Sequence, residues 1–260
     1  MNPRTLLVPV RALAPVLALT FACSPTASQA EGERGAVAPE PTEVVAERGL
    51  GFEWSGAAKE LEISTVDGDI RIEPSSGKGV RVRGTKSGKD AADVEIEVDV
   101  KGDRVTIGPR YPERSRTDAR VDFVVEVPAG VAVEAATVNG GVKARDVTAA
   151  LKVSTVDGNI STAACPDVRG NTVNGGMTVE LPKGAKRAQL EAVNGQLELR
   201  MKPDIGASVQ ANTVNGAIDS DFPLSRTKEV VGSHASGKLG DGSATIVLAT
   251  VNGRIKLKKA

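Results

Sequence analysis

Thr65-Val66-Asp67-Gly68-Asp69-Ile70 decides the fold, because the chain contains this phrase seven times with few changes. Each copy has a small or β-branched residue, Val, Asn or Asp, Gly, one variable residue and one apolar residue. The other six copies begin at Thr137, Thr155, Thr172, Ala192, Thr213 and Thr250. Their starts lie 18, 17, 20, 21 and 37 residues apart, and 37 is close to two shorter steps with one degraded copy between them. A near-constant period predicts a stacked repeat architecture.

The Asn-Gly or Asp-Gly pair in each copy predicts a sharp corner between two strands. Gly has no Cβ, and Asn or Asp tolerates the left-handed region better than other side chains, so the pair adopts positive φ at low cost. We expect seven equivalent corners, formed by Asp67 and Gly68, Asn139 and Gly140, Asp157 and Gly158, Asn174 and Gly175, Asn194 and Gly195, Asn215 and Gly216, and Asn252 and Gly253.

Two architectures use corners of this kind. In an antiparallel meander or sandwich each pair is a hairpin turn, whereas in a parallel β-solenoid each is the same corner of successive coils, stacked about 4.8 Å apart. The identity of the corners favours the solenoid, because stacked Asn and Asp side chains can hydrogen-bond to the backbone of the next coil. The period fits a coil of about three strands with the Thr-Val and Ile positions inside. Residues 49–260 then make roughly ten coils, and the meander stays open as the alternative.

The rest of the chain also has the periodicity of strands. Residues 80–83 and 94–100 alternate aliphatic and charged residues, as a half-buried strand requires. No segment has a 3.6-residue apolar stripe bounded by caps. The sequence therefore predicts an all-β domain, a parallel β-solenoid.

The N-terminus predicts export. Residues 1–22 read as a signal peptide, with Arg4 and Arg11 before an apolar run of 11 residues that ends at Ala22 and is too short to span a bilayer. Cleavage after Ala30 would release a soluble protein, whereas the residues up to Cys23 resemble a lipobox, imperfect at Thr20 and Phe21, that would acylate Cys23. Residues 23–48, rich in Ala, Pro and Glu, are expected to be a disordered linker. We expect a periplasmic or outer-membrane lipoprotein of a bacterium.

Composition narrows the classes of partner. The chain has 33 basic and 33 acidic residues and only 2% aromatic residues, so no nucleic acid partner is expected, and membrane contact only through the lipid anchor. Cys165 is the one cysteine besides Cys23, so no disulfide framework is predicted, and Cys165 reads as a small buried residue.

The residues do not predict an enzyme, a cofactor or a metal site. His234 is the only histidine, so a metal site built from several histidines cannot form. A Ser-His-Asp triad would have to use His234 itself. A polysaccharide-degrading enzyme on a β-helix is the alternative, because carboxylate pairs cleave glycosidic bonds. Its candidate residues are Asp67 with Asp69, Asp157, and Asp219 with Asp221.

A loop at residues 108–120 is the candidate for recognition. Guanidinium groups make paired hydrogen bonds to phosphate and carboxylate groups, so this loop could bind an anionic glycan or an envelope protein. The candidate ligand-binding residues are Arg110, Tyr111, Arg114 and Arg116.

The later repeats carry a family resemblance. The runs Leu181-Pro182-Lys183-Gly184, Ala192-Val193-Asn194-Gly195 and the copies from Thr213 and Thr250 resemble the bacterial "putative adhesin" domain family, over about Val121 to Leu257. The resemblance implies an extracytoplasmic, right-handed β-solenoid, and an adhesin label that rests on architecture. We therefore predict a non-enzymatic cell-envelope scaffold or binding module, with an envelope-stress sensor or regulatory ligand as a further alternative.

Overall fold

The structure is a computed structural model that describes residues 44–113, 117–228 and 232–260. These residues belong to one compact unit, Ala38–Ala260. The predicted signal peptide and most of the predicted linker, with Cys23 as the lipidation candidate, lie outside the described residues, as do Arg114 and Arg116. The described part contains no α-helix and one short 3-10 turn, η1 (Ala91–Asp93).

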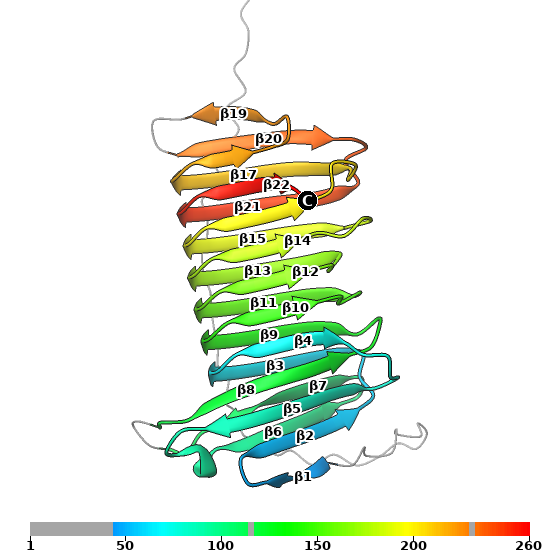
Figure 1. The fold of residues 1–260 in the computed structure, drawn as a ribbon, viewed down its shortest axis with the longest axis vertical. Coiled ribbons are helices and arrows are strands. Elements are labelled where there is room, and N and C mark those ends of the chain that lie inside the picture. The colour runs from blue at the N-terminus through cyan, green and yellow to red at the C-terminus, as the bar shows by residue number, and fades with distance from the viewer. Residues whose placement is uncertain (1–43, 114–116, 229–231) are drawn as a thin grey trace, which may run out of the picture. The chain divides into compact units, whose positions relative to one another are not determined.

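The strands form two eleven-stranded sheets, here called sheet A and sheet B, that pack against each other (Figure 1). Sheet A consists, in spatial order, of β1 (Val44–Arg48), β2 (Gly51–Gly56), β5 (Val80–Ser87), β8 (Arg120–Val127), β4 (Ile70–Pro74), β10 (Val142–Arg145), β12 (Ile160–Ala163), β14 (Met177–Glu180), β16 (Leu197–Met201), β22 (Ile255–Lys259) and β18 (Ile218–Ser220). Sheet B consists of β19 (Ser225–Lys228), β20 (Ser233–Leu239), β17 (Ala207–Asn215), β21 (Ala244–Asn252), β15 (Arg187–Asn194), β13 (Asp167–Asn174), β11 (Ala150–Asp157), β9 (Ala132–Asn139), β3 (Glu60–Asp67), β7 (Arg104–Arg110) and β6 (Glu95–Lys101).

The repeated phrase builds seven coils. Each coil is a long strand of sheet B, a corner and a short strand of sheet A, and corresponding strands pair in parallel, as Thr137, Thr155 and Thr172 do. The predicted parallel β-solenoid is therefore confirmed. The coils have two strands rather than the expected three, and they number seven rather than about ten. The reason is that eight other strands take up the rest of the chain at the two ends of the sheets, and most of their pairings are antiparallel. They are β1, β2, β5, β6, β7, β8, β19 and β20.

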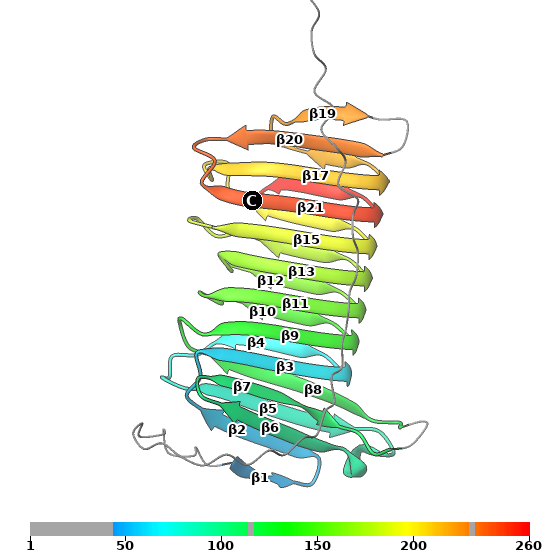
Figure 2. The ribbon, with the colours of Figure 1, turned by 180° about the vertical axis from the view of Figure 1, so that it is seen from behind.

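The last coil does not lie at the end of the stack. Strands β21 and β22 are inserted between the β15–β16 coil and the β17–β18 coil, which Figures 1 and 2 show as red strands below orange and yellow ones. The 37-residue interval before Thr250 therefore holds β18, β19 and β20 rather than a degraded copy of the phrase. Strand β20 pairs antiparallel with β17 and covers that end of sheet B, together with β19.

The corner glycines are required by close packing between coils. A Cβ on Gly158 would lie 1.8 Å from the carbonyl oxygen of Gly140, and all seven corner glycines meet a neighbouring carbonyl at 1.7–1.9 Å in this way. Of the seven, only Gly68 and Gly175 have positive φ, at 152° and 154°, and no corner Asn or Asp does. The expectation that the Asn-Gly pair adopts positive φ is therefore wrong for most copies. Glycine is needed because the next backbone occupies the space of a side chain.

Hydrogen bonds between neighbouring coils explain the other residues that recur in the phrase. The buried Thr155 hydroxyl donates to the Gly140 carbonyl at 3.0 Å. The Asn194 amide donates to the Asn174 side chain at 2.9 Å, so the expected ladder forms between side chains rather than with the backbone. Together these bonds hold each corner in register with the next.

The Thr and Val of each phrase point to opposite faces of sheet B. Thr155 is 1% exposed and faces the core with the aliphatic residues of both sheets, whereas Val156 is only partly buried and faces outward. The expectation that both positions line the interior is therefore wrong for Val. The cause is the period of two along a strand, which directs neighbouring side chains to opposite faces.

The ordered domain begins earlier than predicted. Residues 44–48, assigned to the linker, form β1, which pairs antiparallel with β2 through Val44 opposite Trp54. The edge of β2 offers backbone groups that a neighbouring strand can satisfy, and Val44-Val45 suits a strand. The linker was predicted from the composition of residues 23–48 as a whole, and that average did not distinguish the last five residues from the Pro- and Glu-rich residues before them.

Ala192 replaces the inward-facing Thr in one coil and suggests a stabilising substitution. It is 6% exposed and lies in register between Thr172 and Thr250. Ala192→Thr should add a hydroxyl that donates to the Gly175 carbonyl, just as the Thr155 hydroxyl donates to the Gly140 carbonyl of its own neighbouring coil. The substitution should raise the free energy of unfolding by about 0.5–1.5 kcal/mol. Chemical denaturation measures this change. Ala192→Val is the matched control, and an equal gain from Val would show that volume rather than the hydrogen bond is responsible.

Candidate binding surface

Two of the predicted ligand-binding residues lie at the end of β7. Arg110 is paired with Glu97 at 2.9 Å. Tyr111 packs against the hydrophobic core, and its buried hydroxyl has no hydrogen-bond partner among the described residues. Because Arg114 and Arg116 lie outside the described part, binding by the 108–120 loop stays a prediction.

The candidate carboxylates are engaged in structural contacts. Asp219 lies 3.6 Å from Arg254, and Asp221 accepts a hydrogen bond from Lys258 at 3.1 Å, which lowers the pKa of the Asp221 carboxyl. Asp67 and Asp157 accept hydrogen bonds from the Asn side chains of neighbouring coils, and Asp69 accepts one from a backbone amide. Within the described residues, nothing in this arrangement favours a carboxylate pair for glycoside cleavage.

The Cys165 thiol and the His234 imidazole also have local environments that explain them without a catalytic role. Cys165 is fully buried, and burial raises the pKa of its thiol to about 11. A thiol in this state is a poor nucleophile at neutral pH. His234 Nδ1 lies 2.6 Å from Asn212 Oδ1 on the neighbouring strand. Across residues 44–113, 117–228 and 232–260, His, Cys, Asp and Glu side chains form no group of three that could hold a metal ion.

The outer face of sheet B carries a continuous line of valines, here called the valine row. One valine comes from each coil, and two of them, Val193 and Val214, are 38% and 40% exposed. The others are partly buried by their neighbours. In spatial order the valine row is Val66, Val138, Val156, Val173, Val193, Val251 and Val214.

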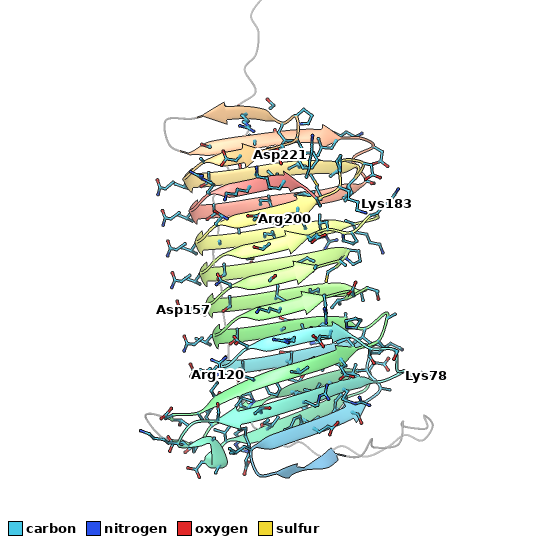
Figure 3. All side chains as sticks on the ribbon, viewed as in Figure 1. Lys78, Arg120, Asp157, Lys183, Arg200 and Asp221 are labelled. Atoms are coloured by element: carbon cyan, nitrogen blue, oxygen red, sulfur yellow. The ribbon has the colours of Figure 1, made fainter. Side chains whose placement is uncertain are left out.

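A line of amides and carboxylates borders the valine row at the corners, and Figure 3 shows Asp157 at this margin of the sheets. The side chains donate to one another at 2.7–2.9 Å along most of the line. Asn139 donates to Asp67 and Asn174 donates to Asp157, whereas no hydrogen bond joins the Asn139 and Asp157 side chains among the described residues. The border is therefore a hydrogen-bonded ladder with one interruption, between Asn139 and Asp157.

A shallow hollow of about 180 Å³ lies at the other end of the same strands. It exists because Ala132 and Ala150 have only methyl groups, whereas Glu60 and Asp167 on the flanking strands have longer side chains. Strands β3, β9, β11 and β13 supply these four residues in neighbouring positions. The hollow is thus a gap two strands wide in a line of outward side chains.

The charges around the hollow are divided between its two sides. Glu60, Glu62 and Glu134 lie on the β3 and β9 side, and hydrogen bonding to Glu60, with the charges of all three carboxylates, raises the pKa of Arg104 beside them. Lys152 and Arg169 are neighbours on the β11 and β13 side. Lys152 is paired with Glu134 at 2.5 Å across the middle. The hollow therefore has a mainly acidic side, which includes Arg104, and a mainly basic side, which includes Asp167.

The outer face of sheet A is different, because charged pairs cover it. Arg200, labelled in Figure 3, lies 2.6 Å from Glu198 on its own strand, and Arg145 lies 3.2 Å from Glu73 on the next. Such pairs, with an exposed Arg and a partly buried Glu, keep the face polar. The apolar row is thus a property of sheet B.

Comparison with known proteins identifies the family. The family model described as Toastrack DUF4097 matches residues 54–258. The chain belongs to this family. The resemblance seen in the repeats is thereby confirmed.

Solved structures similar to this Toastrack chain include two proteins described as adhesion proteins. A "putative cell adhesion protein" from Clostridium sporogenes is 14% identical, with 81% of this chain and 100% of that chain covered and a TM-score of 0.42. A "putative adhesin" from Bacteroides fragilis is 12% identical, with 81% and 97% covered and a TM-score of 0.30. No curated protein matches the sequence. In the described part of the chain, no helix has the length and apolar character needed to cross a membrane.

Sequence reasoning missed both features of the binding surface. The valine row could have been found, because strict alternation places Val on the face opposite to the inward-facing Thr or Ala in every copy of the phrase. The hollow could not, because it depends on which strands are neighbours: Glu60 lies beside Ala132, far away in the sequence.

Proposed function

We propose that this Toastrack protein is a non-enzymatic binding module of the cell envelope, and that the outer face of sheet B is its binding surface. The valine row is the observation that carries this proposal. An outward face that served only solubility would carry polar side chains, since alternation of apolar and polar residues is enough to build the core. Seven aligned valines instead offer an apolar line about 29 Å long, given a strand spacing of about 4.8 Å.

The stacked corners make this surface rigid. Backbone and side-chain hydrogen bonds hold each coil to the next along the border of the valine row. A preformed surface loses little conformational entropy when a partner binds. The predicted export signal and the family support an envelope location, where an envelope protein or an anionic glycan would be the partner.

Photo-crosslinking in the native envelope tests the proposal. A photoreactive amino acid at Val173, in the valine row, should yield adducts of higher mass, whereas the same residue at Thr178, on the outer face of sheet A, should not. Val156→Lys places a charge beside Val173 and should remove most of the adduct without unfolding the protein. Equal adduct formation at positions 173 and 178, or none at 173, would contradict the proposal.

A further inference from the structure

The hollow on sheet B has a shape and a charge distribution that no structural role of the strands requires. Ala132 and Ala150 leave the backbone of β9 and β11 accessible between Glu60 and Asp167. These flanking residues lie three strand steps apart, or about 14 Å between backbones. The side chains of Glu60 and Asp167 take up part of this distance between the β3 and β13 backbones. Because an extended chain covers about 3.5 Å per residue, the space left between the two side chains fits one or two amino-acid residues.

The charges favour a ligand that carries both signs over a ligand of a single sign. A simple anion beside Lys152 and Arg169 would also lie near Glu134 and Asp167, whereas a simple cation beside Glu62 and Glu134 would lie near Arg104 and Lys152. A ligand with a positive group at one end and a negative group at the other pairs each end with the predominant charge of its side. Three carboxylates outnumber Arg104 on one side, and Lys152 and Arg169 outnumber Asp167 on the other. Its positive end would face the β3 and β9 side, and its negative end would face the β11 and β13 side.

The basic side has a group available for such a ligand. Arg169 is exposed and makes no hydrogen bond or ion pair with another described residue, while its neighbour Lys152 is engaged only with Glu134. That pair is solvent-exposed, with side chains 49% and 42% accessible, so a ligand can compete for either partner. A guanidinium group binds a carboxylate through two parallel hydrogen bonds.

We propose that the hollow binds a short peptide with free ends. Its ammonium group contacts Glu62 and Glu134, its carboxylate contacts Arg169, and its backbone lies over the methyl groups of Ala132 and Ala150. This inference rests on the proposed function in taking the outer face of sheet B as the binding surface. It adds a ligand class and a second contact region, at the opposite end of the strands from the valine row.

Three dipeptides test the proposal on the purified protein. Amide chemical shifts are followed by NMR at pH 7 during addition of alanylalanine, N-acetyl-alanylalanine and alanylalanine amide. The unblocked dipeptide should cause saturable shifts in β9, β11 and β13 at millimolar concentration. Each blocked form should bind at least fivefold more weakly, because one of its charges is missing. Absence of saturable shifts, or equal binding of all three, would overturn the proposal.

Variants locate the site. Arg169→Gln should weaken binding of the unblocked dipeptide at least fivefold, and Ala150→Leu should abolish it by filling the hollow. Arg200→Gln, a charge change on sheet A, is the matched control and should leave binding unchanged. Unaltered binding by both hollow variants would overturn the assignment. Val156→Lys should leave dipeptide binding intact, because Val156 lies at the other end of the strand. Absence of envelope crosslinks at position 173 in the otherwise unsubstituted protein, together with saturable dipeptide binding, would reject only the function proposed for the valine row.

Discussion

Gly158→Ala is expected to lower the free energy of unfolding by about 3–5 kcal/mol, although it adds only one methyl group. The new Cβ would lie 1.8 Å from the Gly140 oxygen and 2.6 Å from its carbon, and both are backbone atoms. A side-chain neighbour could rotate away, but a backbone neighbour can move only if the two coils separate. Separation would stretch the hydrogen bond from the Gly140 N–H to the Asp157 carbonyl, now 3.0 Å, and disturb packing on both sides.

Urea denaturation followed by circular dichroism measures this loss. Gly77→Ala is the control, because a Cβ there would meet only the Ser75 hydroxyl at 3.4 Å, an ordinary contact. That variant should change stability by less than about 0.5 kcal/mol. Similar stabilities for the two variants would show that the corner carbonyls do not constrain the glycines.

Removal of Ala244–Ala260 is expected to abolish cooperative folding. In most solenoids the last coil is terminal and its loss shortens the stack. Here the last coil is internal, so its removal leaves β15 and β17 without the strand that joins them. It also removes four large side chains, Ile246, Leu248, Ile255 and Leu257, each 0% exposed. At about 1.5–3 kcal/mol each, their burial is comparable with the whole stability of a typical domain, about 5–15 kcal/mol.

Thermal unfolding followed by circular dichroism, with light scattering for aggregation, measures the effect. Removal of Ala260 alone is the control, since that exposed residue contributes one backbone hydrogen bond, to Met201. The control should unfold as the full chain does. A shortened chain ending at Ser243 that kept a cooperative transition near the original temperature would mean that β17 and β18 can stack directly on β15 and β16.

The repeated phrase was sufficient to predict the parallel stacking, but not the number of coils. Seven identical corners require equivalent environments, and a stack of coils provides them. Residues 71–136 contain no copy of the phrase, and there the chain forms β5 to β8 and covers one end of the sheets. These end strands alternate apolar and polar residues but contain no copy of the phrase. The period of the phrase therefore could not predict how many end strands there are or how they pair.

The candidate site was predicted less well than the fold. The arginines near residue 110 attracted attention because of their chemistry, but Arg110 is paired with Glu97, and Tyr111 packs on the core. The valine row is part of the repeated phrase, but both Thr and Val of the phrase were predicted to lie in the interior. Alternation within a single strand was the signal that would have placed it outside.

The sequence by itself determined where the strands of this protein turn and that corresponding residues of the repeats form straight lines. The Asn-Gly or Asp-Gly pair marks each turn, and the near-constant period aligns one copy with the next. Only the tertiary structure decided that the final coil lies inside the stack and that Glu60 and Asp167 border a gap above Ala132 and Ala150. All coils offer nearly the same strand edges to a neighbouring coil, so strand pairing alone permits several orders of the coils in the stack. The connections and the packing of the whole chain select one of these orders.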